Sequence, residues 1–152
     1  MKEKIKNKGK LSPLDTSKLE RIPPYNIEAE ESLLGSMLIS KDVIVSVMDI
    51  VKSDDFYRKS NQEIFSMIIE LYVKGEPADP ITIADNLKKK GLLDEVGGKT
   101  YIHSLISNVP LAANAEYYAQ IVRSNSILRR LIYAATEIAT MGYEVPEDLN
   151  ST

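Results

Sequence analysis

The residue types that could support catalysis are few and widely spaced along this chain. Gly98-Lys99-Thr100 has the ending of a P-loop, a motif whose backbone N–H groups wrap the phosphates of a nucleotide. A P-loop needs another glycine five residues before its Gly-Lys pair, and Leu93 stands there. His103 is the only histidine, and no recognisable metal ligands accompany it. We therefore interpret residues 98–100 as the start of a helix and His103 as a half-exposed structural residue.

Three pairs of adjacent charged residues could also take part in chemistry. Glu30-Glu31 and Asp54-Asp55 are acid pairs, but neighbouring side chains point in different directions and do not converge on one reacting atom. We interpret them as helix caps and solvated faces. Arg129-Arg130 could clamp an anion or pair with acids of a partner, and the simpler alternative is a solvated helix face. An enzyme with an unrecognised site is therefore the alternative with the least support.

The net charge of the chain is −3, and it is unevenly distributed. Residues 1–20 hold six lysines against three acids, whereas the remainder holds 13 basic and 19 acidic side chains. An acidic body argues against DNA as its main ligand, since DNA-binding domains usually carry a basic surface. We expect residues 1–20 to be a disordered, solvated basic tail. The alternative is an accessory nucleic-acid-binding module that uses this tail together with Arg129-Arg130.

The sequence contains no cysteine and no apolar run of 18 residues. Without cysteine the chain can form neither disulfides nor thiolate metal sites, which fits a reducing compartment. Without a long apolar run, we expect no segment to span a membrane. The sequence therefore predicts a cytoplasmic protein without a membrane partner.

Five short helices are expected to form a compact helical head over residues 21–109. The expected helices cover 27–39, 41–51, 61–74, 81–90 and 99–107. Asn26 and Asp79 are plausible N-caps, and Pro80 suits a first helical position. Gly35 falls within the first helix, whose apolar residues are expected to lie on one side. A glycine there costs about 1 kcal/mol against alanine, and close approach of another helix would explain it.

One long helix is expected over residues 110–143, with Pro110 at its start and Gly142 as a left-handed stop. At about 1.5 Å per residue it would be longer than the head is wide, so part of it should project. Its main apolar line follows alternating three- and four-residue steps through Tyr117, Ile121, Leu128, Leu131, Ala135 and Ile138, with Ser124 filling the gap. Further apolar residues on other faces favour association with partner helices. A long core helix that closes the domain, or a break at 124–126, is the alternative.

Several separated blocks of this sequence resemble the N-terminal domain of the DnaB-type replicative DNA helicases of bacteria. The blocks agree in order and spacing over about residues 21–143. They include RIPPYNIEAE at 21–30, LLG at 33–35, DFY at 55–57, NQEIF at 61–65, AAN at 112–114 and YYA at 117–119. The resemblance implies an all-α fold in which the long helix is the first arm of a helical hairpin. Residues 144–152 would then be a truncated linker or the start of the second arm.

The resemblance also implies a role in assembly and partner docking. Heads and hairpins of this family pair between subunits, from dimer to hexamer, in a tier built as a trimer of dimers. The tier binds the C-terminal domain of primase, and a helicase loader acts on the hexamer. This domain would contact DNA only weakly or indirectly. Head-to-head packing would use the first two helices.

The resemblance further implies that the catalytic machinery lies elsewhere in the family's full-length protein. The RecA-like domain that binds ATP and Mg²⁺ is absent from this chain, so we expect no catalytic, cofactor or metal residues in it. The full-length protein is expected to be an ATP-dependent 5′–3′ DNA helicase. The family role and the exposed-looking positions of the long helix favour six residues for primase docking or hairpin pairing: Tyr101, Arg129, Ile132, Tyr133, Thr136 and Ile138.

Overall fold

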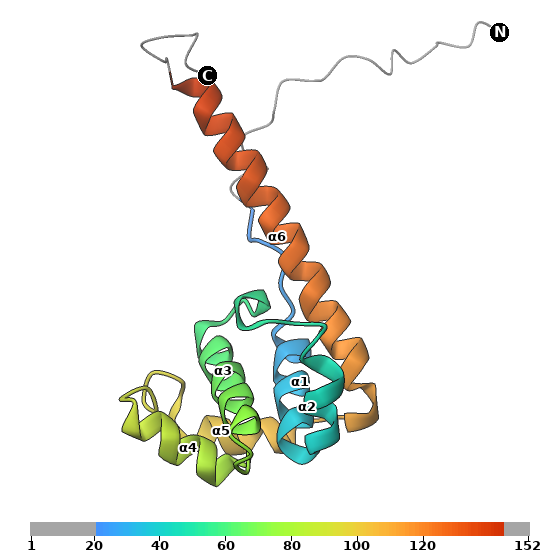
Figure 1. Ribbon diagram of the computed structural model, residues 1–152. Helices are drawn as coiled ribbons and strands as arrows, with labels where there is room; N and C mark the ends of the chain where they lie inside the picture. The colour runs from blue at the N-terminus through green and yellow to red at the C-terminus, as the bar shows by residue number, and fades with distance from the viewer. Residues whose placement is uncertain (1–20, 145–152) are drawn as a thin grey trace, which may run out of the picture.

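Six α-helices and two short 3₁₀ turns make up residues 21–144, which are the residues that the computed structural model describes (Figure 1). The elements are α1 Ile27–Ile39, α2 Lys41–Val47, η2 Ser53–Asp55, α3 Lys59–Val73, α4 Pro80–Lys89, α5 Gly98–Ser107, η3 Ala112–Asn114 and α6 Ala115–Tyr143. Within this part of the chain there is no strand, and the predicted all-α fold is confirmed. None of these helices is both long and apolar enough to cross a bilayer. The predictions for residues 1–20 and 145–152 lie outside the described residues.

Helix α1 is the centre of the head, which is formed by α1 to α5. It packs against α2, α3, α5 and α6. Its buried residues include Leu33, Leu34 and Met37, but also Glu30 and Ser36 on other sides of the helix. The expectation that α1 buries only one side is therefore wrong, because neighbouring elements surround it.

Gly35 marks the closest approach of another helix to α1. A Cβ at this position would collide with the carbonyl oxygen of Leu105 in α5 and with Cγ2 of Val109. Any side chain would push these two segments apart, so only glycine fits without a shift of the backbone. The predicted reason for this mid-helix glycine is confirmed.

Local sequence signals account for several helix starts. The Asn26 side chain accepts a hydrogen bond from the N–H of Ala29 at 2.9 Å, and Asp79 caps the N–H of Thr82 at 2.9 Å. Both predicted caps are confirmed. Helix α5 begins at Gly98, so the interpretation of residues 98–100 as the start of a helix is also confirmed.

Helix α3 is joined to the end of α4 by a carboxylate between two lysines. Glu70 accepts hydrogen bonds from Lys90 at 2.5 Å and from Lys74 at 2.9 Å. These two bonds lower the pKa of the Glu70 carboxyl from 4.5 to about 2, and the bond from Lys90 has the larger effect. The folded-state pKa lies below the ordinary one, so the contact favours folding at neutral pH and is lost as the pH falls through about 2.

Two helix boundaries differ from the prediction. Helix α2 ends at Val47, although the apolar pattern continues to Val51, which is buried beyond the end of the helix. Helix α6 begins at Ala115, because Leu111 is extended and the η3 turn packs against α1. Gly142 lies within α6 and does not adopt a positive φ, so its predicted role as a left-handed stop is wrong.

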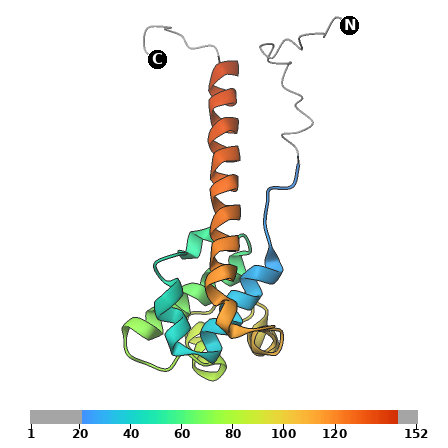
Figure 2. The same cartoon turned by 90° about the vertical axis from the view of Figure 1, so that its right-hand side faces the viewer.

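Helix α6 packs on the head with its first half and projects with its second half (Figures 1 and 2). It is continuous through residues 124–126, so the alternative of a break there is wrong. From Arg130 to Glu144 every residue is exposed except Ala139, which is half-buried. About 20 Å of helix therefore extends beyond the head at 1.5 Å per residue. The alternative of a core helix is wrong for this half.

Candidate interaction surface on the long helix

The carboxylate of Asp55 fixes α6 onto the head. Its side chain is completely buried in the η2 turn. It accepts hydrogen bonds from Ser126 Oγ at 2.7 Å, Arg130 Nη2 at 2.9 Å and Arg123 Nη1 at 3.1 Å. The backbone N–H of Lys52 donates a further bond at 2.8 Å. Three donors on one helix thus converge on one buried anion, which sets where α6 leaves the head.

Arg129 completes this junction from the same helix. Its guanidinium donates to the carbonyl of Asp55 at 2.6 Å and to the carbonyl of Pro24 at 2.9 Å. It also lies 5.5 Å from the centre of the Tyr57 ring, which stacks on Tyr25. Only 6 % of Arg129 is exposed. Its bonds tie the segment before α1 to the side of α6.

A second buried carboxylate, Glu30 of α1, organises the start of α3. It accepts hydrogen bonds from the backbone N–H of Tyr57 at 2.8 Å and from Asn61 Nδ2 at 3.0 Å. Asn61 in turn accepts a bond from the hydroxyl of Tyr101 at 2.5 Å. Burial is the main reason why the pKa of Tyr101 is raised. This network holds α1, α3 and α5 together.

The interpretation of the acid pairs and of Arg129-Arg130 as solvated faces needs correction. Glu30 and Asp55 are buried hydrogen-bond acceptors, while Asp54 is exposed. Arg130 is half exposed but forms ion pairs with both Asp54 and Asp55. The only sequence signal for these roles is that Glu30 and Asp55 stand within the blocks that carry the family resemblance.

The face of α6 opposite the head carries a continuous line of exposed apolar side chains. The head-facing residues are Ala115, Ala119, Val122, Ser126 and Arg129. The opposite face presents the outer stripe, which comprises Tyr117, Ile121, Leu128, Leu131, Ala135 and Ile138, all exposed. Leu131 is 65 % exposed and Ile138 is 69 % exposed. The stripe repeats every three and four residues with Ser124 in the gap, the spacing by which one helix packs along another.

The structure does not bring the six predicted interface residues to one face. Tyr101 lies in the head, and Arg129 is buried, so the premise that it is free for a partner is wrong. The other four, Ile132, Tyr133, Thr136 and Ile138, are exposed on the projecting half of α6. At about 100° per residue, Ile138 belongs to the outer stripe, whereas Tyr133 lies on the opposite side.

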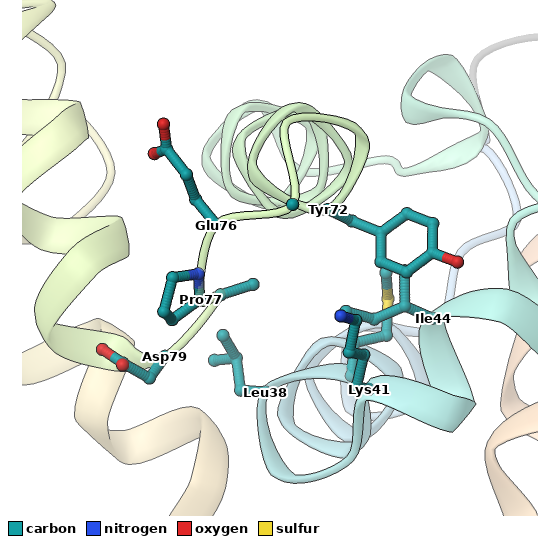
Figure 3. A pocket seen from close by; sticks show the side chains of 10 residues that line it. Leu38, Lys41, Ile44, Tyr72, Glu76, Pro77 and Asp79 are labelled. Carbon is teal, nitrogen blue, oxygen red and sulfur yellow. The ribbon is translucent and has the colours of Figure 1, made fainter.

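The head also contains a surface pocket of about 350 Å³ (Figure 3). It is enclosed by the ends of α1 and α3, the start of α2 and the segment before α4. Figure 3 shows Lys41 and Tyr72 on one side and the carboxylates of Glu76 and Asp79 on the other. The Lys41 ammonium lies 5.8 Å from the centre of the Tyr72 ring. The charged groups do not converge on a common point, so the pocket offers no evident arrangement for catalysis.

Comparisons with known proteins agree with this architecture. The family model of the DnaB-like helicase N-terminal domain matches residues 22–124. The replicative DNA helicase DnaB of Mycobacterium leprae (strain TN) is 50 % identical over 123 residues, which are 81 % of this chain and 20 % of that protein. The replicative DNA helicase DnaC of Bacillus subtilis (strain 168) is 45 % identical over 124 residues, 82 % of this chain and 27 % of that protein.

Solved structures show the same fold. The N-terminal domain of DnaB helicase from Mycobacterium tuberculosis superposes with a TM-score of 0.80 at 48 % identity, covering 82 % of this chain and 90 % of that one. The N-terminal domain of DnaB helicase from Helicobacter pylori, described with its interactions with primase, has a TM-score of 0.68 at 21 % identity. It covers 77 % of this chain and 91 % of that one, and at this identity it supports the fold alone.

The matches cover most of this chain but only a small part of each helicase. This chain spans between 20 % and 27 % of the length of the two curated helicases described above. The match to the family model, by contrast, covers more than half of the chain. The chain therefore belongs to the DnaB-like helicase N-terminal domain family.

Proposed function

We propose that this domain organises the subunits of a replicative helicase and docks primase, with the outer stripe of α6 as its main contact surface. The observation that carries this proposal is the stripe itself. It is exposed along the whole of α6, including the half whose other face is fixed to the head. A contiguous apolar surface of this kind marks an interaction site in a protein that is otherwise well packed.

The junction with the head supports a role in positioning. Hydrogen bonds between η2 and residues Arg123, Ser126 and Arg129 hold the middle of α6, so the projecting half is carried by a rigid base. A preorganised helix loses less conformational freedom when it binds than a flexible one does. The proposed arrangement is that stripes of neighbouring copies, or the second arm of a hairpin, pack against α6 in a dimer-to-hexamer assembly.

Primase is the proposed external partner, through its C-terminal domain. The relative from Helicobacter pylori is described with its interactions with primase, and its fold is shared by this chain. Ile138 would contribute to primase docking through the outer stripe, and Ile132, Tyr133 and Thr136 would contribute through other faces of the projecting half of α6. Aromatic and branched apolar side chains are suitable anchors in such interfaces.

For the full-length protein we propose ATP-dependent DNA unwinding in the bacterial cytoplasm. We also propose that a loader acts on its hexamer.

The test is light scattering of the protein across a concentration series, followed by titration with the primase C-terminal domain. We expect concentration-dependent association of the wild type, and a large shift towards monomer for Leu131→Asp, because a charge in the stripe cannot be buried without a partner. Ile138→Asp is expected to weaken association or primase binding. Wild-type behaviour of both variants would contradict the role of the stripe.

Thr140→Asp provides a matched control for these variants. Thr140 is exposed on the same half of α6, and at about 100° per residue it lies on the side opposite Leu131. It introduces the same charge without touching the stripe. Association should therefore remain close to that of the wild type. An equal loss in Thr140→Asp would indicate a general effect of charge on the helix.

A further inference from the structure

A second surface feature, separate from the outer stripe, is the groove between α4 and α5, which we call the α4–α5 groove. It consists of two adjacent hollows of about 440 Å³ and 290 Å³. Lys88 of α4 and Lys99 of α5 line both hollows, and the exposed His103 lines the larger one. The two lysines thus stand where the hollows meet. The exposed apolar side chain of Ile81 borders the same groove.

The groove carries both signs of charge, because Asp85 and Asp94 line its hollows together with Lys88 and Lys99. Lys88 and Lys89 lie in the last turn of α4, Lys90 is the C-cap of that helix, and Lys99 lies in the first turn of α5. Lys89 is paired with Asp85, and Lys90 is paired with Glu70. Neither Lys88 nor Lys99 forms an ion pair with any carboxylate of residues 21–144. Because Asp85 is already paired with Lys89, the ammonium groups of Lys88 and Lys99, beside the apolar side chain of Ile81, can pair with an acidic peptide that also carries apolar residues.

The sequence of this chain contains one short segment with that composition. Residues 144–149 read Glu-Val-Pro-Glu-Asp-Leu, with three acids and three apolar residues in six positions. We propose that the α4–α5 groove of one copy binds residues 144–149 of a second copy. The carboxylates of Glu144, Glu147 and Asp148 would pair with Lys88 and Lys99, and Val145 or Leu149 would contact Ile81.

The segment must come from a second copy because it cannot reach the groove of its own chain. Helix α6 has 29 residues and extends about 43 Å at 1.5 Å per residue. Figure 1 shows α4 and α5 at the opposite end of the molecule from the C-terminal end of α6. Eight further residues span at most about 28 Å when fully extended. The contact therefore joins the far end of one α6 to the head of another copy.

This contact is expected to be weak alone and effective between copies that are already held together. Exposed ion pairs each contribute little, because water screens them. A peptide of residues 143–152 should therefore bind with a Kd on the order of 0.1–1 mM. Tethering the segment to a neighbouring copy would raise its effective concentration and make the contact favourable.

The test is an NMR titration of the ¹⁵N-labelled 152-residue protein with a synthetic peptide of residues 143–152. We expect saturable shifts centred on Lys88, Lys99 and His103. Lys88→Glu/Lys99→Glu should weaken binding at least about fivefold, which is a realistic loss for two ion pairs. A peptide with Lys at positions 144, 147 and 148 should bind this variant better than it binds the wild type. Lys88→Gln/Lys99→Gln serves if the charge-reversed variant fails to fold.

Lys41→Glu/Lys59→Glu is the matched control, because Lys41 and Lys59 are also exposed, and among residues 21–144 neither has a carboxylate partner. It changes the net charge equally and should bind the peptide like the wild type. Shifts outside the groove, equal losses in both double variants or no saturation by several millimolar would overturn the proposal. The assay is independent of the outer stripe, since Leu131→Asp should leave the peptide affinity unchanged.

Discussion

At the scale of single residues, two buried carboxylates hold the elements together: Glu30 joins helices within the head, and Asp55 joins the head to α6. Asp55 and Glu30 are each almost fully buried, and each accepts several hydrogen bonds from other elements. A buried charge is costly unless such bonds compensate it, so the donors around these carboxylates are part of the fold. The bonds to Asp55 also set the direction in which α6 leaves the head. Stability and the placement of the outer stripe therefore both depend on Asp55.

We expect Asp55→Asn to lower the free energy of unfolding by about 2–3 kcal/mol, because it removes the charge on which Arg123, Arg130 and Ser126 converge. This is below the full range for a broken buried ion pair, since Arg123 and Arg130 are themselves partly exposed. Urea unfolding followed by circular dichroism would measure it. Asp54→Asn, at the exposed neighbour, should change stability by less than about 0.5 kcal/mol. Equal stabilities of the two variants would contradict the role of Asp55.

At the scale of elements, α1 is the helix on which the head is assembled. It is buried on all sides, and its Gly35 allows a neighbour to approach closely. Gly35 is in contact with the backbone of α5, and Ser36 uses its hydroxyl to bond the carbonyl of Ser32 at 2.6 Å within the helix. Because α1 contacts both α5 and α6, a shift at this position would reach the base of the projecting helix.

Because α1 is closely packed at Gly35, we expect a substitution there to change stability in the direction opposite to that which helix propensity predicts. Alanine is a better helix former than glycine by about 1 kcal/mol, yet Gly35→Ala should destabilise the protein by about 1–3 kcal/mol. The added methyl group would collide with the Leu105 carbonyl and with Val109. Thermal unfolding would measure the difference.

Gly142→Ala is the control for Gly35→Ala. Gly142 also lies in a helix, but nothing stands within 4 Å of a Cβ at that position. The substitution should leave stability unchanged or raise it by up to about 0.5 kcal/mol, since helix ends respond weakly to propensity. A stabilising effect of Gly35→Ala would show that α1 and α5 can separate without cost.

At the scale of the whole molecule, the two halves of α6 differ in what holds them. The first half is fixed by packing and by the bonds around Asp55, which extend to Arg130, whereas residues 131–144 are exposed apart from the half-buried Ala139. Such an arm is stable only to the extent that its own helix propensity and its partners allow. An arm of this kind suits a domain that acts by joining other chains.

Amide hydrogen exchange should reveal this division and its dependence on association. In dilute protein we expect amides of residues 131–143 to exchange faster than those of 115–129, because local opening of the projecting half breaks no packing. At concentrations where the protein associates, the same amides should become protected. Fast exchange of residues 131–143 in the associated protein would place the contact elsewhere. Leu131→Asp should abolish the protection, while Thr140→Asp should retain it.

The sequence by itself determined the all-α fold, most helix boundaries and the membership of the family. These features depend on local signals, such as the Asn26 and Asp79 caps, and on blocks of residues that keep their order and spacing. It also identified the apolar line of α6, because a three- and four-residue repeat needs no knowledge of the neighbours. Which face of α6 packs on the head could not be predicted in this way. That face contains Ser126 and Arg129, whose polarity suggests exposure.

Only the tertiary structure decided the roles of the charged residues. Asp55 and Arg129 are 74 residues apart in sequence, and their hydrogen bond exists only when η2 lies against α6. The start of α6 at Ala115 also depends on tertiary packing, because the preceding η3 turn packs on α1. A local pattern reports the periodicity of a helix, whereas the burial of a charge depends on donors brought from distant parts of the chain. For that physical reason the outer stripe could be predicted from the sequence, whereas the hydrogen-bonded junction between η2 and α6, which sets the direction of the stripe, could not.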